Sequence, residues 1–108
     1  MPHSGKLTPH TKFTVEARNI GTSRNGTGVN VGFIVRGDRL VEVDTFTVPA
    51  QSTTPISHEY TPPANRVRVV LDVYPSTLAG SMIRVTQAGV DVLNETISGD
   101  TTFIFDLA

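Results

Sequence analysis

The stretch RVRVVLDVY, residues 66–74, alternates apolar and polar side chains over most of its length. A period of two residues is typical of a β-strand that has one dry face and one wet face. The predicted dry face consists of Val67, Val69, Leu71 and Val73. A single strand cannot bury such a face alone, so this stretch predicts packing against a second layer.

The same period recurs along the chain, and no run has the spacing of an amphipathic helix. Strands are predicted at residues 12–20, 29–36, 39–48, 56–60, 66–74, 82–87, 90–97 and 101–107. Glycine-containing pairs such as Ala88-Gly89 suit the tight turns of hairpins. Because the dry faces must meet, we predict an all-β fold, an antiparallel two-sheet β-sandwich of the immunoglobulin-like class with seven to eight strands.

The third predicted strand changes phase part-way along. Val41 and Val43 share one face, whereas Phe46 and Val48 share the other. A β-bulge inserts one extra residue and reverses the phase of the residues that follow it. We therefore predict a bulge near residues 44–45, which would turn both pairs toward the core.

The chain has 108 residues, which suits a single domain. Residues 1–11 contain two prolines and are predicted as a flexible lead-in, so that residues 12–108 form the sandwich domain. The formal net charge of −1 and the scattered charges give no reason to expect nucleic acid as a partner. No apolar run suits membrane insertion, and the first residues lack the apolar region of a signal peptide.

The tripeptide Arg36-Gly37-Asp38 lies between two predicted strands. An exposed Arg-Gly-Asp sequence is the loop motif that integrin receptors recognise. The same residues also suit a two-residue hairpin turn, because Gly37 and Asp38 tolerate positive φ and Arg36 and Arg39 would then end the strands. We favour the turn, with integrin recognition as the alternative, because tripeptides recur by chance.

Two tyrosines, Tyr60 and Tyr74, are the candidate platforms for a carbohydrate. Sandwich proteins that bind sugars commonly stack them on exposed aromatic rings, and this chain has no tryptophan. Both tyrosines lie at ends of predicted strands, near proline-containing loops. The alternative interpretation is that each ring covers an edge of the sandwich and leaves its hydroxyl in water.

The residue types that bind metals or catalyse reactions form no recognisable motif. The chain has no cysteine, and its histidines lack metal-ligand spacing. Aspartates from separate loops could still converge on calcium. These aspartates are Asp38, Asp44, Asp72, Asp91, Asp100 and Asp106. No nucleophile elbow or other paired catalytic motif occurs, so we predict no catalytic residue, no metal site and no cofactor.

Four motifs follow one another in the first two thirds of the chain: Asn19-Ile20-Gly21, Val29 to Val35, Gly37-Asp38 and Val48-Pro49-Ala50. Their order resembles the opening half of CARDB-type modules, an immunoglobulin-like family of bacterial and archaeal surface proteins. The resemblance implies an extracellular spacer or adhesion module without catalysis. The chain departs from the family at Gln51, where a loop glycine is usual, and in the length of the segment after Tyr74.

Together these features predict a non-enzymatic interaction or structural module of a bacterial surface or virion protein, located outside the cell. A rigid sandwich would present its loops to a partner. The candidate loops are Gly21 to Gly28, Arg36 to Arg39 and Pro75 to Ser81. The partner would be a protein, or a second copy that pairs through an edge strand. The alternative is a small-ligand module for carbohydrate or calcium, and an enzyme is the third hypothesis.

Overall fold

The computed structural model describes residues 3–19, 27–49, 54–75, 81–97 and 99–107, and these residues form nine strands and no helix. The strands are β1 (His3–Leu7), β2 (Phe13–Asn19), β3 (Thr27–Val35), β4 (Arg39–Val48), β5 (Ile56–Tyr60), β6 (Arg66–Pro75), β7 (Ser81–Gln87), β8 (Val90–Ile97) and β9 (Thr101–Leu107). In this part of the chain there is no helix with the length and apolarity needed to cross a membrane.

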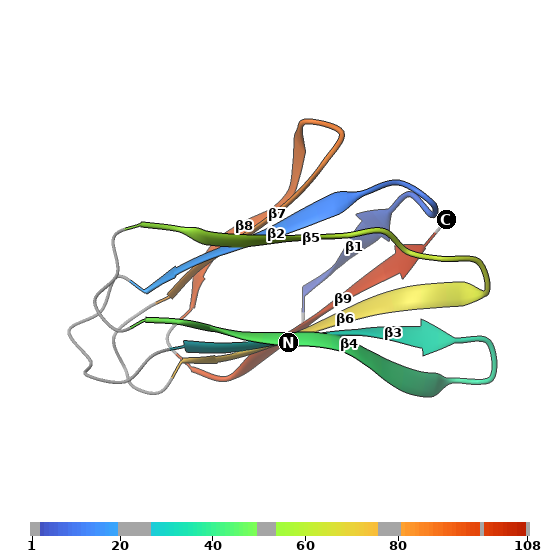
Figure 1. Cartoon of the computed structure of the whole chain (residues 1–108), viewed down its shortest axis with the longest axis horizontal. Coiled ribbons are helices and arrows are strands. Elements are labelled where there is room, and N and C mark those ends of the chain that lie inside the picture. The colour runs from blue at the N-terminus through green and yellow to red at the C-terminus, as the bar shows by residue number, and fades with distance from the viewer. Residues whose placement is uncertain (1–2, 20–26, 50–53, 76–80, 98, 108) are drawn as a thin grey trace.

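The strands form two layers (Figure 1). One sheet has five strands in the order β1-β9-β6-β3-β4, and the other has four in the order β5-β2-β7-β8. All neighbouring strands are antiparallel except β1 and β9, which run parallel. The prediction of an all-β, two-sheet sandwich is confirmed, with one strand more than predicted and one mixed sheet.

The core lies between the sheets and follows the predicted alternation. Along β6, Val69, Leu71 and Val73 are almost fully buried, and Val67 is half-buried at the end of the sandwich. The largest fully buried side chains come from both layers: Phe13, Phe103, Phe105, Leu7, Leu71, Ile83, Val15, Val29, Val31, Val48, Val69 and Val73. Each buried methylene contributes about 0.8 kcal/mol, so these facing rows are the main source of stability.

The prediction of a flexible lead-in is wrong for β1. His3 to Leu7 pair in parallel with Phe103 to Leu107 of β9 at the other end of the chain. Leu7 is 1% exposed and belongs to the core. The pairing partner is about one hundred residues away in sequence, so nothing local in the first residues indicates it.

The bulge in β4 is present and lies next to its predicted position. The ladder between β3 and β4 skips Val43. Phe46 and Val48 consequently face the core and are buried, as expected. Val41 is only half-buried, and Val43 is 44% exposed, so the expectation that both earlier valines face the core is wrong for Val43.

Candidate functional site

The Arg-Gly-Asp tripeptide forms an exposed three-residue loop between β3 and β4. The predicted two-residue loop is wrong, because Val35 and not Arg36 pairs with Arg39. The backbone N–H of Asp38 donates to the carbonyl oxygen of Val35 at 3.0 Å. Gly37 and Asp38 have φ values of +95° and +62°, the region that glycine and aspartate tolerate best.

The loop displays its carboxylate to solvent. The side chain of Asp38 is 87% exposed, and its Oδ1 lies 3.8 Å from Nη1 of Arg68. Arg68 makes a closer ion pair with Asp106, at 3.2 Å. The N–H of Arg36 donates to the carbonyl oxygen of Asn65 at 3.4 Å, which ties the loop to the turn before β6. Each residue of the tripeptide thus has a role in the turn, and all three are exposed.

The other two candidate loops are Gly21 to Gly28 and Pro75 to Ser81. Most of each loop, residues 21–26 and 76–80, lies outside the described residues.

Tyr60 is a core residue, which contradicts its candidacy as a sugar platform. It is 9% exposed, and its ring centroid lies 5.6 Å from that of Phe13. Its hydroxyl donates to Oδ2 of Asp44 at 2.7 Å. Burial, together with this hydrogen bond and the charge of Asp44, raises the pKa of Tyr60 well above 10.0. The sequence contains the signal, since Tyr60 is in phase with half-buried Ile56 on β5.

Tyr74 lies on the solvent face of the five-stranded sheet and is 42% exposed. Its ring lies over Gly28 of β3, because a Cβ built on Gly28 would be 3.7 Å from Cδ2 of the ring. Its hydroxyl accepts a hydrogen bond of 3.4 Å from Nδ2 of Asn30. The two candidate tyrosines therefore do not share a face, and only Tyr74 presents its ring to solvent.

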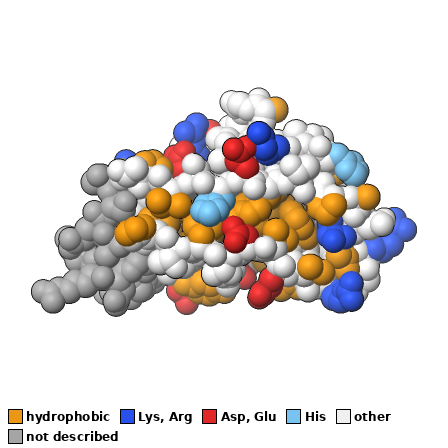
Figure 2. Space-filling view, viewed as in Figure 1, with side chains coloured by type: hydrophobic (Ala, Val, Ile, Leu, Met, Phe, Trp, Pro, Cys, Tyr) orange, Lys and Arg blue, Asp and Glu red, His pale blue; other side chains and the backbone are white. Residues whose placement is uncertain are grey.

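The edge strands β4 and β5 meet along one side of the sandwich. We call this contact, made by Asp44, Phe46, His58 and Tyr60, the β4–β5 edge. The ring of His58 on β5 stacks on Phe46 of β4, with centroids 4.2 Å apart and planes at 12°. Nδ1 of His58 lies 3.4 Å from Oδ2 of Asp44, which also accepts the hydroxyl of Tyr60. Figure 2 shows hydrophobic side chains gathered in a band between these two strands. Sequence reasoning missed this cluster, because no sequence pattern indicates which edges meet.

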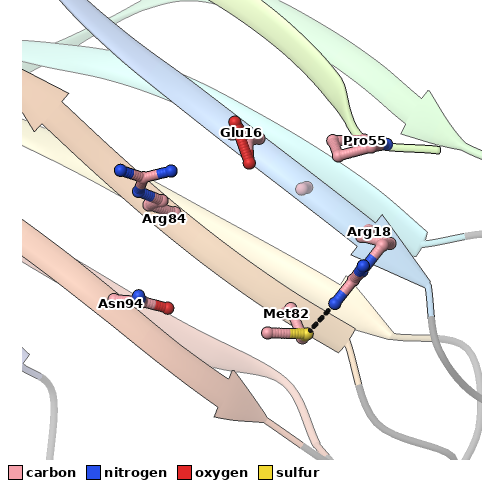
Figure 3. Close-up of a pocket in the computed structure, with 7 residues that line it drawn as sticks. Glu16, Arg18, Pro55, Met82, Arg84 and Asn94 are labelled. Carbon is pink, nitrogen blue, oxygen red and sulfur yellow. Dashed lines mark hydrogen bonds between the residues drawn. The ribbon is translucent and has the colours of Figure 1, made fainter. Parts of the chain in front are cut away.

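A shallow pocket of about 190 Å³ lies on the solvent face of the four-stranded sheet (Figure 3). It is lined by Glu16, Ala17, Arg18, Pro55, Met82, Arg84 and Asn94. Nη2 of Arg84 lies 2.8 Å from Oδ1 of Asp91, so its charge is already paired. Nη2 of Arg18 donates to the sulfur of Met82 at 2.6 Å. The pocket is smaller than the ~300–1,000 Å³ typical of ligand sites.

The structure does not gather the candidate calcium ligands. Within the described ranges, no group of three histidine, aspartate or glutamate side chains could hold a metal ion. Asp72 accepts a hydrogen bond from Thr102 within the five-stranded sheet. Asp91 pairs with Arg84 within the four-stranded sheet. Asp38 and Asp106 both lie near Arg68, and Asp44 accepts the hydroxyl of Tyr60.

The chain matches no protein-family model, no curated protein and no solved structure. The resemblance to CARDB-type modules stays a prediction, carried by the four sequence motifs.

Proposed function

We propose that the protein is a non-enzymatic interaction module of a bacterial surface or a virion, and that it binds a second copy of itself through the free edge of β4. The observation that carries this proposal is the exposure of Leu40 and Val43, which are 50% and 44% exposed on an edge strand. Exposed apolar residues beside unpaired backbone groups are the features through which sheets pair with other chains.

The length of β4 supports pairing through this strand. β4 has ten residues and lies at the free end of the five-stranded sheet. Its outer side therefore offers backbone N–H and C=O groups over a span of about 33 Å. The bulge at Val43 interrupts this edge, and a bulge of this kind limits pairing to short segments. The expected product is a dimer with a small interface, formed reversibly.

The immunoglobulin-like subclass is part of the proposal, and the strand order supports it. The order β9-β6-β3-β4 corresponds to the G-F-C-C′ strands of such domains, and the β5–β2 pair corresponds to E–B. The β7–β8 hairpin follows β6 in sequence and occupies the side of β2 where strand A would lie. This inserted hairpin accounts for a segment after Tyr74 that is longer than CARDB-type modules need.

Sedimentation velocity over protein concentrations up to about 100 µM tests self-association, since weak interfaces dissociate in the micromolar range. Wild type should show a concentration-dependent dimer. Leu40→Gln and Val43→Thr should each shift the equilibrium to monomer without lowering the melting temperature. Val90→Thr is the matched control, because Val90 is 63% exposed but lies on β8 of the other sheet. A wild-type protein that stays monomeric, or variants that dimerise like the control, would overturn the proposal.

A further inference from the structure

The solvent face of the five-stranded sheet carries a row of polar side chains beside Tyr74. Thr45, Asn30, Asp72 and Thr102 lie opposite one another on β4, β3, β6 and β9. Oγ1 of Thr45 donates to Oδ1 of Asn30 at 2.8 Å, and Oγ1 of Thr102 donates to Oδ1 of Asp72 at 2.6 Å. These bonds hold the amide and the carboxylate in fixed orientations.

The ring of Tyr74 extends this row on the same face. Tyr74 follows Asp72 by two residues on β6, and Gly28 is its direct neighbour on β3. Since Gly28 has no side chain, one face of the ring rests on the strand, and Tyr74 as a residue is still 42% exposed. The hydrogen bond from Asn30 to its hydroxyl orients the ring. The result is an aromatic surface whose position is set before any ligand arrives.

We propose that Tyr74, Asn30 and Asp72 form a binding site for a neutral oligosaccharide. A sugar ring has an apolar C–H face that can stack on an aromatic ring and a rim of hydroxyls that needs donors and acceptors. Asn30 has a second N–H donor, and Oδ2 of Asp72 is an acceptor in addition to the oxygen that binds Thr102. The site thus offers stacking, one donor and one acceptor on a single face, a combination typical of small-ligand sites.

The charge of the site selects neutral sugars over acidic ones. Asp72 is the one charged member of the polar row and is anionic. The nearest cation along β6 is Arg68, four residues away or about 13 Å, and it is paired with Asp106. An acidic saccharide would meet an uncompensated carboxylate. The proposed sugar site rests on its own contacts and does not depend on self-association.

Tyrosine fluorescence can report on this site directly. The chain has no tryptophan and two tyrosines, so Tyr60→Phe leaves Tyr74 as the single emitter. We would titrate this variant with the neutral hexamers cellohexaose, mannohexaose and N-acetylchitohexaose, and with the hexamer of galacturonic acid as the acidic probe. The fluorescence of Tyr74 should change saturably with at least one neutral hexamer. It should not change with the acidic hexamer. No change with any neutral hexamer at millimolar concentration would overturn the proposal.

Calorimetry on variants locates the binding. Tyr74→Ala should weaken binding of the responsive hexamer at least about tenfold, whereas Tyr74→Phe should keep it within about threefold. Asn30→Ala should weaken binding without altering the melting temperature by more than a few degrees. Val90→Thr, on the other sheet, is the control and should bind as wild type. Unchanged affinity in a folded Tyr74→Ala variant would show that the sugar binds elsewhere and would overturn the assignment.

Discussion

The hydroxyl of Tyr60 donates a 2.7 Å hydrogen bond to Oδ2 of Asp44, and this bond connects β5 of one sheet to β4 of the other. Strands β4 and β5 share no backbone ladder, because each is the last strand of its own sheet. Among the described residues, side-chain contacts join the two strands at this edge of the sandwich. The Phe46–His58 stack lies beside the bond and adds apolar contact to it.

Tyr60→Phe should lower the free energy of unfolding by about 1 kcal/mol, because it removes one bond to a charged acceptor and leaves the buried ring in place. The melting temperature should fall by roughly 4–8 °C. Thermal denaturation at neutral pH measures this change. Asp44→Asn is the matched variant, and a Tyr60→Phe protein that melts with wild type would mean that the bond contributes nothing.

The raised pKa of Tyr60 predicts a loss of stability in alkali. In the unfolded chain the phenol ionises near pH 10.0, whereas in the folded protein burial and Asp44 hold it neutral to higher pH. The stabilisation is complete below about pH 10 and is lost as the pH rises above it. Urea denaturation at pH values from about 8 to about 11 gives the free energy of unfolding. This free energy should decline less steeply with pH for Tyr60→Phe than for wild type. Equal slopes would contradict the assignment.

The buried hydroxyls of Thr27 and Ser81 lie 2.7 Å apart and join β3 to β7 across the core. Thr27→Val keeps the shape of the side chain but leaves the hydroxyl of Ser81 without this partner, so it should cost about 1–2 kcal/mol. The double variant Thr27→Val/Ser81→Ala should recover part of that loss, because no polar group is then left unpaired. Chemical denaturation of wild type, the two single variants and the double variant gives their free energies of unfolding. If the losses of the two single variants simply add in the double variant, the two hydroxyls are not coupled.

Gly32 is buried under the side chain of Leu40. A Cβ added at Gly32 would lie 2.9 Å from Cδ1 of Leu40 and 3.3 Å from the carbonyl oxygen of Val41. Leu40 is 50% exposed and its Cδ1 can move aside, whereas the carbonyl oxygen of Val41 belongs to the backbone. Gly32→Ala should therefore destabilise the protein by no more than about 1 kcal/mol. In a Leu40→Ala background the same change should cost less, because the contact with Cδ1 of Leu40 is gone and the backbone of Val41 and Glu42 remains. An equal cost in both backgrounds, measured by urea denaturation, would show that Leu40 does not limit this position.

Ala88 occupies a turn position with positive φ, which asparagine adopts more easily than alanine. Ala88 and Gly89 have φ values of +52° and +76° between the paired residues Gln87 and Val90, as in a type I′ turn. Ala88→Asn should raise the stability by about 0.5–1 kcal/mol, because asparagine adopts this conformation more easily than alanine. Gly89→Ala is the control and should change the melting temperature in the opposite direction. A lower melting temperature for Ala88→Asn would contradict the turn assignment.

Local alternation was sufficient to predict the strands and most of the core, because burial on one face imposes a period of two on each strand. The Ala88-Gly89 hairpin is confirmed for the same reason, since a short turn is encoded by adjacent residues. The strand β1 could not be predicted in this way. Its partner β9 lies at the far end of the chain, and its pairing depends on the assembled sheet.

The candidate site was predictable only in part. Tyr74 was identified as an exposed ring, but its support by Gly28 and its row of polar neighbours depend on the register of four strands. Tyr60 was assigned to the surface because it lies near prolines, although its phase on β5 indicates the inner face. The contact between Asp44 and His58 depends on how the two sheets stack, which the side-chain period does not specify.

The parallel pairing of β1 with β9 has a mechanical consequence. His3 lies beside Phe103 and Leu7 beside Leu107, so β1 begins at one end of this pair and β9 ends at the other. Tension applied to the start of β1 and the end of β9 would load all their interstrand hydrogen bonds at once, in shear. Bonds loaded in this way must break together, whereas an antiparallel hairpin pulled from its open end unzips one bond at a time. The domain is therefore built to resist stretching, and its lifetime under force would depend on its unfolding rate.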